Sequence, residues 1–232
     1  MSERRLQAAV LISGSGSNLN ALIQAIEHSA LALDIVRVIS NRADAGGLAY
    51  AHNAGIPVSV VPHQDYANRD AHDQAISDIL EKNQPELIIL AGYMRILSEA
   101  FAQRYSHCMI NLHPSLLPLY KGLDTYNRAI AAGDAETGAS IHMVTAGLDD
   151  GPVIAQVRIP IGANDDAASL AARLGPLEHQ LLVATVEQFC TQALRYEVLA
   201  DESGESDNKG RLVFKGHKLN APLQLQPDGR LV

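Results

Sequence analysis

An asparagine and a histidine stand two residues apart where a predicted strand enters a proline-rich loop. The segment is Asn111-Leu112-His113-Pro114-Ser115-Leu116-Leu117-Pro118, and it follows the apolar run Cys108–Leu112. In a strand, side chains at positions i and i+2 point to the same side. We therefore expect Asn111 and His113 to aim at one reacting atom, where they would stabilise a developing oxyanion. The plainer alternatives are a hydrogen-bonded buried histidine and a turn-forming asparagine, but the pair at a strand end favours an enzyme.

A carboxylate beside His113 would raise the pKa of its imidazole and orient the ring. The segment Leu148-Asp149-Asp150-Gly151-Pro152 offers two candidates. Both aspartates could equally be turn residues. The residues themselves do not choose between Asp149 and Asp150.

A glycine- and serine-rich loop, Ser13-Gly14-Ser15-Gly16-Ser17-Asn18, precedes a predicted helix. Free N–H groups at a helix N-terminus favour phosphate. The loop lacks the Gly-Lys-Ser/Thr of a Walker A motif, and Leu19 replaces the last glycine of a dinucleotide fingerprint. Phosphate binding and a tight turn capped by Ser17 or Asn18 both remain open.

Other candidate groups carry weaker signals. The segment Gly92-Tyr93-Met94-Arg95-Ile96-Leu97 mixes apolar side chains with one cation, which suits either a pocket for a flat, partly anionic ligand or a plain connection. Glu178 lies on a predicted helix, where a charge usually faces solvent. His142, in an apolar strand, either faces the site or is a satisfied core residue. The histidines and cysteines show none of the usual metal-binding spacings.

The elements that must position these residues alternate along the first half of the chain. Leu19, Leu22, Ile23 and Ile26 follow the spacing of an amphipathic helix. The uniformly apolar run 87–91 is typical of a strand buried on both faces. This alternation predicts an α/β fold with a doubly wound, mainly parallel, Rossmann-like sheet. Expected strands are 8–12, 35–39, 58–61, 87–91 and 108–112, and expected helices are 19–26, 43–54, 69–82 and one capped by Ser98.

The second half follows a different pattern. Runs 139–145 and 153–159 are separated by a turn-rich loop, which predicts an antiparallel pair at the sheet edge. A helical pattern over 165–194 is expected to break or kink at Gly175-Pro176. Residues 201–210 are polar and loop-like, and 212–214 and 223–225 are expected as short edge strands. We expect one domain over 1–198 and a C-terminal extension, 199–232, packed on it or trailing from it.

Composition narrows the class of protein. The 232 residues carry a formal net charge of −8, which argues against a broad nucleic-acid surface. No apolar run reaches the length of a membrane helix, and the first residues do not form a signal peptide. The two cysteines, Cys108 and Cys190, lie in apolar segments and are expected as free thiols. We expect a soluble, cytoplasmic protein.

The motifs taken together resemble one family. Five segments in order resemble the phosphoribosylglycinamide formyltransferase family, the folate-dependent transformylases of purine biosynthesis. Methionyl-tRNA formyltransferases share the His-Pro-Ser-Leu-Leu-Pro loop but lack the Gly-Ser-Gly-Ser-Asn loop, and formyltetrahydrofolate deformylases usually carry an N-terminal regulatory domain. The resemblance covers about residues 8–195. Its segments are 12–19, 40–45, 90–97, 111–118 and 148–153.

The resemblance implies a role for each motif. The backbone of Gly16, Ser17 and Asn18 would bind the phosphate of glycinamide ribonucleotide, and Glu178 would hold its ribose or amine end. The catalytic residues would be Asn111, His113 and Asp149, because Asp149 follows the leucine in the family register. The co-substrate would be 10-formyltetrahydrofolate, with no metal. Its expected contacts are Arg69, Met94, Arg95, Ile96, Leu97, Asn111, Thr145, Ala146, Gly147 and Leu148.

This sequence departs from the family at two places. The family commonly has Asp-Gly-Gly-Pro where this chain has Asp149-Asp150-Gly151-Pro152, so a positive φ at Asp150 would be strained, and Asp150 could add negative charge to the site. The family often has His-Thr-His where this chain has Asp124-Thr125-Tyr126. We expect both departures to affect substrate affinity rather than reaction type.

The implied reaction is direct formyl transfer through a tetrahedral intermediate. Asn111 and a protonated His113 would hydrogen-bond to the oxyanion, while Asp149 keeps His113 charged and helps relay a proton. Expected partners are small molecules only, with no nucleic acid and no membrane, and the protein would be a monomer or weak homodimer. Two alternatives stay open: a hydrolase that releases formate from the same cofactor, and a non-catalytic folate- or nucleotide-binding module.

Overall fold

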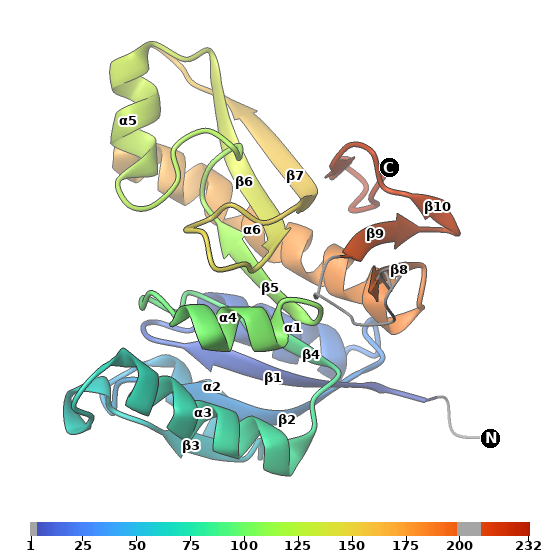
Figure 1. Ribbon diagram of the computed structural model, residues 1–232. Coiled ribbons are helices and arrows are strands. Elements are labelled where there is room, and N and C mark those ends of the chain that lie inside the picture. The colour runs from blue at the N-terminus through green and yellow to red at the C-terminus, as the bar shows by residue number, and fades with distance from the viewer. Residues whose placement is uncertain (1–3, 199–209) are drawn as a thin grey trace, which may run out of the picture.

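The computed structural model describes residues 4–198 and 210–232, and a mixed sheet runs through its centre (Figure 1). Eight strands lie in the order β11-β7-β6-β5-β4-β1-β2-β3. They are β1 (Leu6–Ile12), β2 (Leu33–Ser40), β3 (Val58–Val60), β4 (Leu87–Leu90), β5 (Met109–His113), β6 (Glu136–Met143), β7 (Val153–Pro160) and β11 (Leu223–Gln224).

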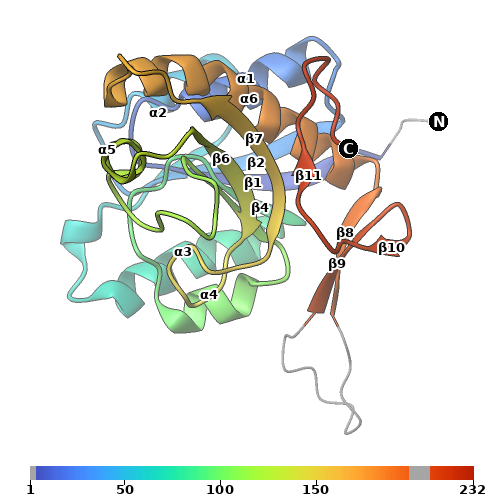
Figure 2. The same ribbon diagram turned by 90° about the horizontal axis from the view of Figure 1, so that it is seen from above.

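Helices cover both faces of the sheet. Strand β1 shows why: Ala8, Val10 and Ile12 belong to one buried cluster, while Ala9 and Leu11 belong to the other. Figure 2 shows α1, α2 and α6 on one face and α3 and α4 on the other. The helices are α1 (Ser17–Glu27), α2 (Gly47–Asn53), α3 (Arg69–Asn83), α4 (Glu99–Tyr105), α5 (Thr125–Ala132) and α6 (Ala167–Cys190), with a 3-10 turn at His63–Asp65.

The strand directions confirm the predicted sheet. Strands β3, β2, β1, β4 and β5 pair in parallel, whereas β6 is antiparallel to both β5 and β7. Short β11 pairs in parallel with β7 at the far edge. The first half is therefore doubly wound, and the antiparallel edge lies where the sequence pattern placed it.

Three elements differ from the sequence-based expectation. Helix α2 begins only at Gly47, after a loop that the pattern had included. Helix α5 was not predicted, although it is bounded by Asp124 and Gly133, both in the left-handed region at φ 59° and 73°. Helix α6 is one continuous helix through Pro176, starting at an Asp166 capping box, so the expected break is wrong.

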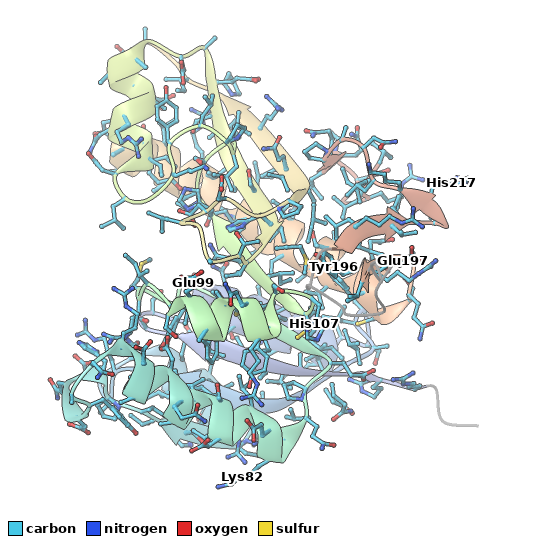
Figure 3. The ribbon with its side chains drawn as sticks, in the orientation of Figure 1. Lys82, Glu99, His107, Tyr196, Glu197 and His217 are labelled. Atoms are coloured by element: carbon cyan, nitrogen blue, oxygen red, sulfur yellow. The ribbon has the colours of Figure 1, made fainter. Side chains whose placement is uncertain are left out.

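The C-terminal residues form a second, smaller sheet and reach back to the first. Strand β9 (Gly210–Phe214) lies between β8 (Leu194–Val198) and β10 (His217–Lys218), so it is a central strand and not an edge. Glu197 on β8, labelled in Figure 3, accepts hydrogen bonds from both Arg195 and Arg211. The buried Leu223 joins the core beneath α6. Of the expected loop over 201–210, residues 201–209 lie outside the described residues and Gly210 begins β9. The domain boundary at 198 stays a prediction.

Both cysteines, Cys108 and Cys190, are free and partly buried. Burial raises the pKa of the Cys108 thiol to about 12. Across residues 4–198 and 210–232, we find no helix with the length and apolar character needed to cross a membrane.

Candidate active site

The Asn111–His113 pair lies in β5, in the interior of the main sheet. Both residues belong to the strand, which extends one residue beyond the expected range of 108–112 and so includes His113. His142 on β6 pairs directly opposite Asn111 in the antiparallel ladder, which places the two side chains on one face. Asn111 Nδ2 lies 3.1 Å from His142 Nε2. His142 therefore belongs to the site and not merely to the core.

Asp149 completes the cluster. Its Oδ2 lies 3.4 Å from His113 Nδ1, and its Oδ1 lies 3.6 Å from His142 Nε2. The Gly122 N–H donates a hydrogen bond of 2.9 Å to Asp149 Oδ2. Because β6 is antiparallel to β5, the loop after β6 starts beside the beginning of β5 and folds back across the strands (Figure 1). The structure thus brings Asn111, His113 and Asp149 together.

The neighbouring Asp150 turns away from this cluster. Its carboxylate forms an ion pair with Lys121. The positive φ of the loop falls on Asp149 itself, at 46°, whereas Asp150 is not among the residues with positive φ. The strained backbone conformation is therefore that of Asp149, whose carboxylate contacts His113. Strained backbone conformations are common at functional sites.

The pKa values of His113 and Asp149 both depart from their ordinary values. Burial lowers the pKa of His113 below the ordinary value, outweighing the Tyr120 carbonyl and the Asp149 charge, which both raise it. Asp149 raises the pKa of His113 as expected, but this contribution does not outweigh burial. Burial opposes the charge on Asp149 too, but the nearby His142 ring and the hydrogen bond from the Gly122 N–H hold the pKa of Asp149 below the usual value.

Buried polar side chains of β6 and β7 hold the loop after β5 in place. Ser140 Oγ donates to the Ser115 carbonyl and accepts from the Leu117 N–H. Gln156 Nε2 donates to the Leu117 carbonyl at 3.0 Å. The loop then turns so that the Tyr120 carbonyl lies 3.0 Å from His113 Nε2. This scaffold fixes one ring nitrogen of His113 against a backbone acceptor.

The glycine- and serine-rich loop ends at Gly16, the N-cap of α1, where φ is 76°. A Cβ at Gly16 would lie 2.3 Å from the Gly47 Cα, so both the conformation and the space require glycine. The N-cap makes no side-chain hydrogen bond, so capping by Ser17 or Asn18 is wrong. The Asn18 Oδ1 is buried without a hydrogen-bond partner. The first turn of α1 thus keeps free N–H groups that suit an anion.

The segment after β4 is tied to the same loop. Ser13 Oγ accepts a 2.8 Å hydrogen bond from the Met94 N–H and donates to Asn41. The apolar side chains of Met94 and Ile96 are 72% and 56% exposed. Arg95 has a buried Nε with no partner. These side chains remain available to a ligand.

The remaining expected positions lie in the loop before Asp149, on α6 and at the start of α3. Residues 145–148 lead directly into Asp149, and Leu148 is exposed. Glu178 lies on α6, where Tyr126 Oη donates a 3.3 Å hydrogen bond to it and burial raises the pKa of its carboxyl. Arg69 is the first residue of α3 and is exposed, and no contact described here joins it to the cluster.

Sequence reasoning missed several contributors. The backbone of Tyr120 and Gly122, and the side chains of Lys121 and Tyr126, carry no chemical motif of their own. For His142 a signal existed, because its strand was predicted. Only the pairing of that strand with β5 was missing, and this pairing sets Asn111 opposite His142.

Comparison with known proteins identifies the class. Residues 6–186 match the family model for formyl transferases. The chain therefore belongs to the formyl transferase family.

Within this class, similar proteins include two phosphoribosylglycinamide formyltransferases and a longer trifunctional protein. The chain is 42% identical over 187 residues to the phosphoribosylglycinamide formyltransferase of Haemophilus influenzae, covering 81% of this chain and 88% of that protein. A solved phosphoribosylglycinamide formyltransferase from Coxiella burnetii has a TM-score of 0.84 and 41% identity, covering 93% of this chain and 96% of that one. The trifunctional purine biosynthetic protein adenosine-3 of Drosophila melanogaster is 44% identical over 77% of this chain. The matched region covers only 13% of that longer protein.

Proposed function

We propose that this chain transfers the formyl group of 10-formyltetrahydrofolate to the amine of glycinamide ribonucleotide, in purine biosynthesis. Its similarity to phosphoribosylglycinamide formyltransferases over most of both chains supports the reaction. The observation that carries the assignment to residues is the cluster of Asn111, His113 and Asp149 in a chain of this family. A protein that only binds folate or nucleotide does not need a proton-accepting His113 in one cluster with the Asn111 amide and the Asp149 carboxylate.

In the proposed mechanism, the amine nitrogen attacks the formyl carbon and the carbonyl electron pair moves onto oxygen. Asn111 uses one amide hydrogen on His142 and offers the other to this oxyanion. Removing one such donor typically costs on the order of 10²- to 10³-fold in rate. The carbon–N10 bond then breaks, and the amine proton ends on N10 of tetrahydrofolate.

His113 is the proposed carrier of that proton. A neutral ring that donates from Nε2 to the Tyr120 carbonyl has its lone pair on Nδ1, beside Asp149. The lowered pKa favours this neutral form before the reaction. After accepting the amine proton, the imidazolium would be stabilised by Asp149 and would in turn stabilise the oxyanion. The proton is then passed to N10.

The substrates would bind on either side of this cluster. The free N–H groups of Gly16, Ser17 and Asn18 would hold the ribonucleotide phosphate, and Glu178 its ribose or amine end. The exposed Met94, Ile96 and Leu148, with the remaining expected folate contacts, would hold the co-substrate. We further propose a cytoplasmic enzyme that acts without metal or nucleic acid, as a monomer or weak homodimer.

A product assay separates the proposal from its rivals. The protein is mixed with 10-formyltetrahydrofolate in the presence and absence of glycinamide ribonucleotide, and tetrahydrofolate, formate and formylated ribonucleotide are followed. The proposal predicts that tetrahydrofolate appears only when the ribonucleotide is present. Its amount should equal that of the formylated ribonucleotide. Formate released without the ribonucleotide would establish a deformylase, and no turnover at all would indicate a binding module.

A further inference from the structure

Three consecutive residues of the loop after β5 contact the cluster or the residue next to it. The Tyr120 carbonyl accepts from His113, and the Gly122 N–H donates to Asp149. Between them, the Lys121 ammonium pairs with the carboxylate of Asp150. Two adjacent residues of one loop therefore hold two adjacent residues of the other.

The remaining contacts of both partners support a built connection. Asp150 folds back over Gly147, where a Cβ would lie 2.8 Å from the Asp150 Cβ. The Lys121 carbonyl accepts a 2.6 Å hydrogen bond from Arg128 Nη1. Arg128 therefore fixes the backbone of Lys121, while Asp150 fixes its side chain.

We propose that the Lys121–Asp150 ion pair is a latch that positions the Asp149 carboxylate against His113. Asp149 has a positive φ, and its carboxylate receives a single backbone hydrogen bond, from Gly122, among the contacts described here. Lys121 directly precedes Gly122 and Asp150 directly follows Asp149. An ion pair between Lys121 and Asp150 therefore keeps the Gly122 N–H within hydrogen-bonding distance of the Asp149 carboxylate. Lys121 and Asp150 are positioning residues, since neither contacts the reacting groups, and their effect on turnover rests on the proposed function.

The ion pair also accounts for a second carboxylate directly after Asp149. The pair neutralises the extra carboxylate, so it does not add a free negative charge beside Asp149. Both side chains are partly exposed, at 35% for Lys121 and 63% for Asp150. The latch should therefore be modest in strength and screened by salt.

The test uses Lys121→Met, Asp150→Asn and the charge-exchanged double variant Lys121→Asp/Asp150→Lys. Glu136→Gln breaks the exposed Glu136–Arg158 pair, away from the cluster, and serves as matched control. The rate of hydrogen exchange at the Gly122 amide, measured by NMR, reports how well the hydrogen bond from Gly122 to Asp149 is held. This measurement does not depend on turnover. Each single variant should speed this exchange about two- to fivefold at low salt, the size that an exposed pair supports, and the double variant and the control should match the wild type.

Turnover provides the second readout. In the single variants kcat should fall about two- to fivefold while the KM for the ribonucleotide stays unchanged, and 1 M salt should bring the wild type and the single variants together. Wild-type exchange at Gly122 in both single variants, or a double variant as impaired as either single, would overturn the latch. An exchange effect in a protein that lacks formyl transfer would reject the proposed function and leave the latch standing.

Discussion

At the scale of single residues, the spacing of Asn111 and His113 was enough to predict that they share one side of a strand. The choice of Asp149 over Asp150 needed the register of a family, and the structure brings Asp149 to His113. The sign of the His113 pKa shift could not be predicted. It depends on the balance of burial against a nearby carboxylate, and burial is a property of the folded chain.

The His113 imidazole should titrate below its ordinary pKa of about 6.5. Because the Asp149 charge raises that pKa, Asp149→Asn should move the midpoint to still lower pH. NMR titration of the histidine ring protons measures this, with His113→Asn used to assign the signal. A midpoint above 6.5 in the wild type, or an upward move in Asp149→Asn, would contradict the proposed proton acceptor.

At the scale of elements, the strands of the parallel half were predicted better than the helices and the loops. The strands of the parallel half lie close to where apolar runs placed them, since such runs are buried on both faces. The Ser13–Asn18 loop was ambiguous because short glycine motifs have many uses. Its structure shows that Gly16 is required by the backbone, so a larger residue there would not report on phosphate binding.

Gly16→Ala and Asn18→Ala should therefore behave differently. The alanine at position 16 would take a left-handed φ and meet the Gly47 backbone, which should cost about 1–3 kcal/mol or more of folding stability. Asn18→Ala removes the side-chain amide but keeps the backbone N–H that is proposed to bind the phosphate, so this variant should fold normally and leave the KM for the ribonucleotide unchanged. Urea denaturation and steady-state kinetics measure the two variants. A raised KM in Asn18→Ala would contradict phosphate binding through the backbone alone.

At the scale of the whole molecule, the alternation of strand and helix predicted the doubly wound sheet and its antiparallel edge. It could not predict that β6 pairs with β5, because several antiparallel arrangements satisfy the same pattern. That pairing delivers both His142 and the loop carrying Asp149. The tail was equally hard to place, since the short β11 is defined by its pairing with β7 more than by its own sequence.

The central claim is that this cluster moves the formyl carbon directly between substrates. The most direct measurement is a single turnover with 10-formyltetrahydrofolate labelled at the formyl carbon and bound glycinamide ribonucleotide. In the wild type, the label should pass entirely to the ribonucleotide amine. In His113→Ala and Asp149→Asn it should pass on the order of 10²-fold or more slowly, with ribonucleotide binding intact. Label recovered as formate, or wild-type rates in either variant, would contradict the account.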